Sequence, residues 1–141
     1  MIHLKIDIEP VAKARPRFSK YGTYTPKKTK AYEETIRDEF LQKYKNETLP
    51  MFDRDTPLVV IASFGKSIPK SYSKKKRAAC LSGEAAPTIK PDVDNYLKAV
   101  LDALNGLAFE DDAQIVRTIA EKQYSERPYV QLTIRRAGNE S

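Results

Sequence analysis

Residues 92–106 read DVDNYLKAVLDALNG, and this stretch indicates the architecture more clearly than any other part of the chain. Its apolar residues recur at i, i+3, i+4 and i+7, a spacing typical of a helix with one buried face. These residues are Leu97, Val100, Leu101 and Leu104. Asp92 or Asp94 can cap the start of this helix, and Asn105-Gly106 can end it. The stretch therefore predicts an amphipathic helix with acidic residues at its entrance.

The rest of the chain alternates between strand and helix patterns. Strands are predicted at residues 2–9, 57–64, 113–123 and 129–135, and further helices at residues 29–45 and 71–81. The first of these helices has a stripe of core residues at Tyr32, Ile36, Phe40 and Tyr44, and Ser71 or Ser73 can cap the second. Residues 10–28 combine prolines with basic and aromatic residues, which is typical of a long exposed loop. We expect an α+β fold, in which one small domain of residues 1–141 contains a mixed β-sheet flanked by helices.

Positive charge is concentrated in two segments. The chain has 25 Lys and Arg against 19 Asp and Glu, a formal net charge of +6. Residues 13–30 contain seven of the basic residues and residues 66–77 contain six, and neither segment contains an acid. One such segment is typical of a solvated surface, but two in a chain whose remainder is acidic favour a polyanionic partner.

A single histidine, His3, and a single cysteine, Cys80, restrict the chemistry. They exclude an intramolecular disulfide, a cysteine-based zinc site and Ser-His or Cys-His catalysis. No segment approaches the roughly 20 apolar residues of a membrane span, and residues 1–7 lack the organisation of a signal peptide. We therefore expect a cytoplasmic protein that uses neither a membrane nor a small-molecule cofactor.

Acidic residues gather around the helix predicted from residue 92. Asp92 and Asp94 lie in its extended entry segment, where side chains two positions apart point to the same side. Lys98 follows Asp94 by one helical turn, and Asp111-Asp112 return just before a predicted strand. Carboxylates completed by waters describe a Mg²⁺ site, and Lys98 would stabilise charge that develops on a phosphate.

The same residues also have an ordinary structural interpretation. Asp94 can serve as an N-cap, Asp94 and Lys98 as an i, i+4 pair, and Asp111-Asp112 as a turn. Against this, aspartates crowded at one edge repel one another unless a cation lies between them. The residues alone leave both interpretations open.

The order and spacing of these motifs resemble the signature of a known family. Residues 92–98 (DVDNYLK), 101–106 (LDALNG) and 111–116 (DDAQIV) are similar to the core of the RusA-type Holliday junction resolvases of bacteria and prophages. Residues 13–17 (KARPR) and 24–27 (YTPK) are similar to the opening loop of that family.

The resemblance implies a homodimeric, Mg²⁺-dependent endonuclease, with Mn²⁺ as a substitute ion, that binds four-way DNA junctions. Such an enzyme nicks two opposed strands symmetrically in DNA recombination and repair. Carried over by position, the metal-binding aspartates of the family fall on Asp92, Asp94 and Asp112, and its catalytic lysine falls on Lys98. Asp111 either assists the ion or caps the turn.

We expect the two basic segments to contact DNA phosphates, because clustered Lys and Arg neutralise the backbone without reading sequence. The expected contacts are Lys13, Arg15, Arg17, Lys20, Lys27 and Lys28 in the loop, and Lys74, Lys75, Lys76 and Arg77 in the helix at 71–81. For that helix the expectation rests on charge alone. Phe18, Tyr21 and Tyr24 either stack on unpaired bases at the crossover or pack against the domain.

Two other functions stand as alternatives. One is a general metal-dependent nuclease, such as a restriction-type fold, whose Pro-Asp start matches Pro91-Asp92 but whose later acid-x-Lys motif is missing. The other is a non-catalytic module that binds branched DNA. The substitution Asp92→Asn separates the last from an enzyme, since an enzyme would keep binding and lose cleavage.

Overall fold

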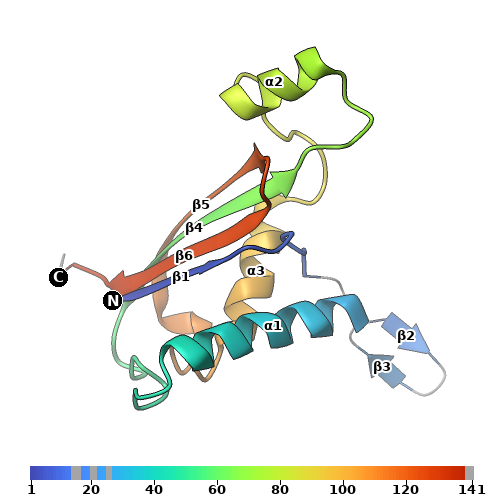
Figure 1. Ribbon diagram of the computed structural model, residues 1–141. Coiled ribbons are helices and arrows are strands. Elements are labelled where there is room, and N and C mark those ends of the chain that lie inside the picture. The colour runs from blue at the N-terminus through green and yellow to red at the C-terminus, as the bar shows by residue number, and fades with distance from the viewer. Residues whose placement is uncertain (14–16, 20–21, 25–26, 139–141) are drawn as a thin grey trace.

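The computed structural model describes residues 1–13, 17–19, 22–24 and 27–138, with the backbone alone for residues 17–19 and 22–24. At its centre is a four-stranded sheet in the order β1-β6-β4-β5 (Figure 1). Its strands are β1 (Ile2–Ile6), β4 (Leu58–Ser67), β5 (Ile115–Ser125) and β6 (Tyr129–Arg136). β6 pairs antiparallel with β1 and β4, while β4 pairs parallel with β5. The predicted α+β fold with a mixed sheet is confirmed.

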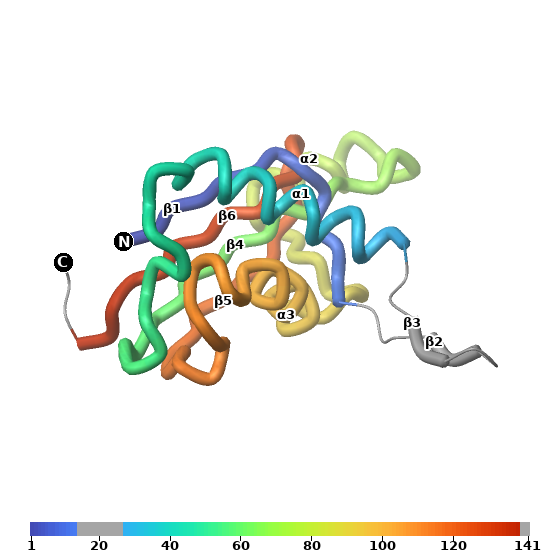
Figure 2. The backbone as a smooth tube through the Cα atoms, turned by 90° about the horizontal axis from the view of Figure 1, so that it is seen from below, coloured from blue at the N-terminus to red at the C-terminus, as the bar shows by residue number. Residues whose placement is uncertain are grey.

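Two helices cover one face of this sheet, as Figures 1 and 2 show. They are α1 (Lys27–Lys43) and α3 (Val93–Leu104). In α3, the predicted stripe turns toward the sheet, because Val100, Leu101 and Leu104 are buried and Leu97 packs partly buried against the core. This burial fixes the orientation of α3 and leaves its polar residues on the opposite side.

Helix α1 is held by residues four positions apart. Tyr32, Ile36 and Phe40 are buried in the core, and the Phe40 ring lies 5.0 Å from the half-buried ring of Tyr44. The hydroxyl of Tyr44 also accepts a hydrogen bond from the backbone N–H of His3, at 2.9 Å. The predicted role of this stripe in the core is confirmed, and it ties α1 to β1.

The connection between β4 and β5 carries much of the polar chemistry. Neighbouring parallel strands need a crossover connection, and here it contains α2 (Lys74–Ser82), α3 and the short 3-10 helix η1 (Asp112–Gln114). α2 stands away from α1 and α3, near the end at which β4 leaves the sheet (Figure 1). Cys80 is the buried residue of α2.

The structure corrects the predicted loop at residues 10–28. Within it, β2 (Arg17–Ser19) and β3 (Gly22–Tyr24) pair as a small antiparallel hairpin, and α1 begins at Lys27. β1 ends at Ile6 rather than at residue 9, because the chain turns there and the Ile8 N–H donates to the Ile6 carbonyl at 3.0 Å. The prediction was wrong because a uniform loop pattern hides a short hairpin.

Other boundaries shift by a few residues. β5 begins at Ile115 instead of residue 113, since η1 occupies the positions before it. β4 continues to Ser67 beyond the predicted end at residue 64, and α1 ends at Lys43 instead of residue 45. Ser73, one of the two predicted caps of α2, accepts the backbone N–H of Lys76 at 3.2 Å. No helix in the described part of the chain has the length and apolarity needed to cross a membrane.

Candidate active site

The entrance of α3 presents two carboxylates that the helix itself does not use. Asp92 occupies the N-cap position with extended backbone angles, yet its side chain makes no capping hydrogen bond. Its side chain is 55% exposed, and the Lys90 ammonium lies 3.5 Å from its Oδ1. Asp94 lies exposed in the first turn of α3, which begins at Val93, so the extended entry segment predicted to contain both aspartates contains Asp92 and not Asp94. The ordinary N-cap role therefore does not account for the Asp92 carboxylate, whose oxygens face solvent.

A lysine from the sheet holds the segment that leads into α3. The ammonium of Lys122, on β5, donates to the carbonyls of Ile89 at 2.7 Å and Pro91 at 2.9 Å. This double contact fixes the chain immediately before Asp92. Sequence reasoning missed Lys122, although a lysine two positions from Ala120 on a strand shares its helix-facing side, where a charge needs partners.

Lys98 lies one turn after Asp94 and is held by a carboxylate that the sequence interpretation passed over. Its ammonium lies 3.0 Å from Oδ1 of Asp102, an i, i+4 pair on α3. The other oxygen of Asp102, Oδ2, lies 3.2 Å from the ammonium of Lys13. Lys13 also binds Oε1 of Glu33 on α1, at 2.6 Å. The expected DNA contact Lys13 is thus engaged inside the protein.

Asp111 and Asp112 arrive at the site through η1. Oδ1 of Asp111 accepts the N–H of Ala113 at 3.3 Å, and the Gln114 amide oxygen accepts the N–H of Asp111 at 3.2 Å, forming a capping box. Asp111 was expected either to assist the ion or to cap the turn, and this geometry shows that it caps the turn. Gln114 further donates to the carbonyls of Asp53 at 2.6 Å and Thr56 at 2.8 Å, which anchors the turn.

The pKa of Asp112 responds to the charges around it. A hydrogen bond to Asp111 raises the pKa of Asp112, burial and the charge of Asp102 raise it further, and the Lys98 ammonium lowers it. The same bond to Asp112 lowers the pKa of Asp111. One carboxyl of the pair therefore holds its proton longer than the other. We call Asp92, Asp94, Asp111 and Asp112 together the acidic rim.

The chemistry of the acidic rim fits a hard divalent cation. Its donors are carboxylate oxygens, and Mg²⁺ in proteins is commonly held by one or two carboxylates with waters completing the octahedron. Across the described ranges 1–13 and 27–138, no three His, Cys, Asp or Glu side chains gather as a ready-made metal group. Asp92 and Asp94, two positions apart at the start of α3, are the candidate carboxylate ligands within these ranges.

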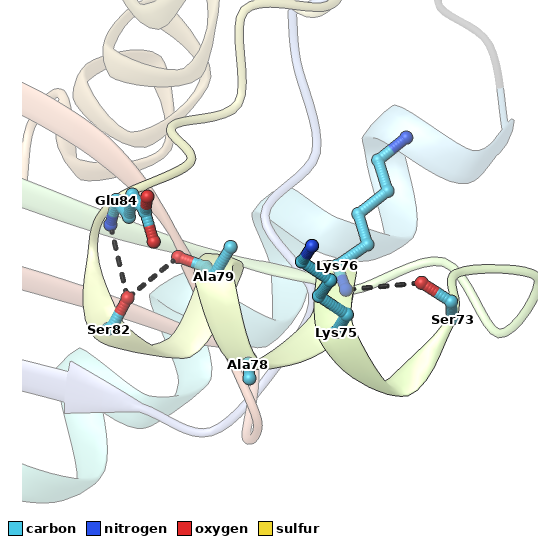
Figure 3. A pocket seen from close by; sticks show the side chains of 7 residues that line it. All are labelled: Ser73, Lys75, Lys76, Ala78, Ala79, Ser82 and Glu84. Carbon is cyan, nitrogen blue, oxygen red and sulfur yellow. Dashed lines mark hydrogen bonds between the residues drawn. The ribbon is translucent and has the colours of Figure 1, made fainter.

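The expected DNA-binding residues fall into three groups. On α2, Lys74, Lys75 and Lys76 are exposed and Arg77 is half-buried; we call these four residues the basic helix. Figure 3 shows Lys75 and Lys76 extending from α2 beside Ser73, and the Lys76 ammonium lies 3.9 Å from the centre of the Tyr72 ring. A second group, Lys27 and Lys28, is exposed at the start of α1.

The third group lies within residues 14–26, whose side chains the structure does not describe. Arg15 and Lys20 are outside the described residues altogether, as is Tyr21. For Arg17, Phe18 and Tyr24, in β2 and β3, the backbone alone is described. Their predicted contacts with DNA stay predictions.

Comparison with known proteins identifies the family of this chain. The family model described as "Endodeoxyribonuclease RusA" matches residues 7–135. The chain belongs to the RusA endodeoxyribonuclease family. The RusA match spans the acidic rim, Lys98 and the basic helix, together with β4, β5 and the crossover between them, whereas β1 precedes the matched residues.

A curated relative of this RusA family member comes from Bacillus subtilis (strain 168), where it is described as "Uncharacterized protein YqaN". The two sequences are 39% identical over 131 residues, which covers 90% of each chain. Similarity of this extent indicates a shared fold over nearly the whole length of both proteins.

Proposed function

We propose that this protein is a Mg²⁺-dependent, structure-selective endodeoxyribonuclease that resolves four-way DNA junctions by paired, symmetric nicks. The observation that carries the proposal is the entrance of α3, where Asp92 and Asp94 are exposed next to Lys98 in a member of an endodeoxyribonuclease family. An exposed oxygen-ligand pair beside an ammonium suits a phosphate diester, which carries negative charge and gains more during attack.

In the proposed mechanism, Asp92 and Asp94 would hold a Mg²⁺ ion, for which Mn²⁺ would substitute, and Asp112, which does not gather with them in the described structure, would have to approach to become a third ligand. When bound, the ion acts as a Lewis acid toward the phosphate oxygens. Lys98 donates from its ammonium to a non-bridging oxygen of the scissile phosphate and so stabilises charge that develops during hydrolysis. Lys122 keeps Asp92 in register by holding the Ile89 and Pro91 carbonyls.

The basic residues supply the affinity for DNA in this proposal. The basic helix and the exposed Lys27 and Lys28 neutralise backbone phosphates, a contribution that weakens as salt is added and that carries no sequence information. We further propose that the protein acts as a homodimer, because symmetric incision of two opposed strands requires two sites related by a two-fold axis.

The test is cleavage of a synthetic mobile four-way junction beside a linear duplex of the same sequence. Each is incubated with the wild-type protein in Mg²⁺, in Mn²⁺ and in EDTA. Wild type should give paired symmetric nicks in the junction alone, and EDTA should abolish them. Asp92→Asn should retain junction binding and lose nicking, whereas the control Asp38→Asn, at an exposed aspartate of α1, should cut as wild type does.

Two other outcomes correspond to the alternative functions. Binding without nicks in either metal would leave a non-catalytic module for branched DNA. Equal cutting of the linear duplex would indicate a general metal-dependent nuclease. If Asp92→Asn still nicks the junction, the protein is a nuclease but the proposed metal site is wrong.

A further inference from the structure

Asp102 is shared between two lysines that come from distant parts of the chain. Oδ1 faces the ammonium of Lys98 at 3.0 Å and Oδ2 faces the ammonium of Lys13 at 3.2 Å. The side chain of Asp102 is 21% exposed, whereas that of Lys98 is 58% exposed. The carboxylate of Asp102 thus joins Lys98, in the candidate active site, to Lys13, which precedes the β2–β3 hairpin in the chain.

Lys13 is fixed from several directions. Its backbone N–H donates to the carbonyl of Asn95, in the first turn of α3, at 3.0 Å. Its ammonium lies between Glu33 of α1 and Asp102 of α3. Burial alone would lower the pKa of Lys13, but the hydrogen bonds to Glu33 and Asp102 raise it above its ordinary value. Lys13 therefore remains charged and pins Asp102 from outside the helix.

A lysine side chain loses rotamer entropy when it is held in one position. Lys98 is more than half exposed, so its ammonium would sample many positions unless a partner restricts it. Groups that orient a reacting residue spare this cost at the moment of reaction, and losing such a partner typically lowers activity about 10- to 100-fold. Asp102 is placed to do this for Lys98.

We propose that Asp102 is the positioning residue for Lys98, and that Lys13 locks Asp102 in the required orientation. The inference rests on the proposed nuclease function and names the residues that prepare its lysine. It also gives Lys13 a different task from phosphate binding. Because Lys13 immediately precedes the segment that leads to the β2–β3 hairpin, the root of that basic segment and the active-site lysine are joined through one carboxylate.

The rival explanation is an ordinary surface pair. An isolated i, i+4 ion pair stabilises a helix only slightly and has no bearing on catalysis. That explanation does not account for the contact of Lys13, which comes from another segment, with Asp102. A second rival makes Asp102 a metal ligand. The three explanations give different kinetics.

The experiment measures single-turnover cleavage of the four-way junction by full-length protein in excess, as a function of Mg²⁺ concentration. D102N keeps the shape of the side chain and removes its charge. We expect its rate constant at saturating Mg²⁺ to fall about 10- to 100-fold, while the junction affinity and the Mg²⁺ concentration for half-maximal rate change less than about twofold. K13M should lower the rate in the same way by a smaller factor, and D102E should recover part of it.

The decisive comparison is made in a K98M background. If Asp102 acts through Lys98, adding D102N to K98M costs nothing further, because the interaction is already gone. An equal loss in both backgrounds would overturn the positioning role. A D102N cleavage rate within about twofold of the wild-type rate would also overturn it. A large rise in the Mg²⁺ concentration that D102N needs would instead indicate that Asp102 is a metal ligand.

Controls separate these outcomes from trivial ones. D38N removes one exposed carboxylate of α1 and should cut as wild type does, and thermal melting checks that each variant is folded. If D102N does not fold, K13M provides the test. A wild-type cleavage rate for K13M would overturn the proposal that Lys13 holds Asp102 in the orientation that positions Lys98. If the wild-type protein itself cuts no junction, the proposed function fails first, which is visible before any variant is compared.

Discussion

The acidic rim is tied into the body of the protein at several points, whereas the basic helix stands apart from it. Gln114 alone joins η1 to two backbone carbonyls of the segment before β4, and Lys122 fastens the chain ahead of Asp92 to β5. α2 packs mainly against β5, and three of its four basic residues are exposed. Groups that perform chemistry need fixed positions, while groups that bind a flexible polyanion gain from freedom to adapt.

The largest effect expected from this contrast is on cleavage, at the entrance of α3. Asp94→Asn removes an exposed carboxylate, and loss of several kcal/mol of charge stabilisation should lower the single-turnover rate on the order of 100-fold or more. Junction affinity, measured by gel shift in Ca²⁺, should be kept. Cutting within about tenfold of wild type would show that Asp94 belongs to the helix cap alone.

Gln114 tests how much of the rim depends on its anchoring. Gln114→Ala removes the hydrogen bonds to two carbonyls, of which that of Asp53 keeps the Thr56 N–H at 3.2 Å, so the free energy of unfolding should fall by about 1–3 kcal/mol. Urea denaturation measures the change. The control Gln42→Ala, at an exposed position of α1, should stay within about 0.5 kcal/mol. A small effect at Gln114 would mean that the turn is held by other contacts.

Lys122 tests the positioning of the rim without disturbing its charges. Lys122→Met keeps the apolar length of the side chain and removes its contacts with the Ile89 and Pro91 carbonyls. The single-turnover rate should fall about tenfold, as expected when the orientation of a ligand is lost, with DNA affinity unchanged. Lys45→Met, at an exposed site after α1, is the matched control. A drop in affinity equal to the drop in rate would instead make Lys122 a DNA contact.

The basic helix should respond in the opposite way. Lys75→Gln removes one exposed charge, so the affinity for the junction should fall modestly and the slope of log affinity against log salt should shrink by about 0.9. Fluorescence anisotropy at several salt concentrations measures both. An unchanged slope would place the basic helix away from the DNA.

The smallest effect concerns the titration of Asp112. Asp111→Asn removes the negative neighbour whose hydrogen bond favours the protonated form of Asp112. The ionised form then becomes easier to reach, so the pKa of Asp112 should fall toward its ordinary value. Carboxyl-detected NMR over the acidic pH range follows this group in the metal-free protein. A pKa that stays raised would assign the shift to burial instead.

The sequence predicted the parts of this molecule that depend on local pattern. The buried stripe of α3, the core residues of α1, the Ser73 cap and the mixed sheet all follow from periodicity and capping rules. η1 was missed because Ile115 and Ile119 drew the strand prediction forward, although Asp111 followed by Gln114 three positions later has the spacing of a capping box. The β2–β3 hairpin was missed because three-residue strands leave almost no periodic signal.

The candidate site was only partly predictable for a different reason. Asp92, Asp94, Lys98 and Asp112 lie within one short stretch, so spacing and a resemblance identify them. The contacts of Lys13 with Asp102 and of Lys122 with Pro91 join residues far apart in the chain. Such contacts are set by the tertiary packing of α1, α3 and β5, and no local pattern encodes them.

The crossover between β4 and β5 has a consequence for how such proteins diversify. Residues 68–114 leave the sheet at one strand and return at its neighbour, and they carry both the acidic rim and the basic helix. The residues proposed to cut and the basic helix proposed to bind DNA therefore lie in one uninterrupted insert between two strands. Within it, α2 precedes α3 and packs apart from it. Evolution, or a designer, can replace α2 with a different DNA-binding segment while the residues proposed to cut keep their positions.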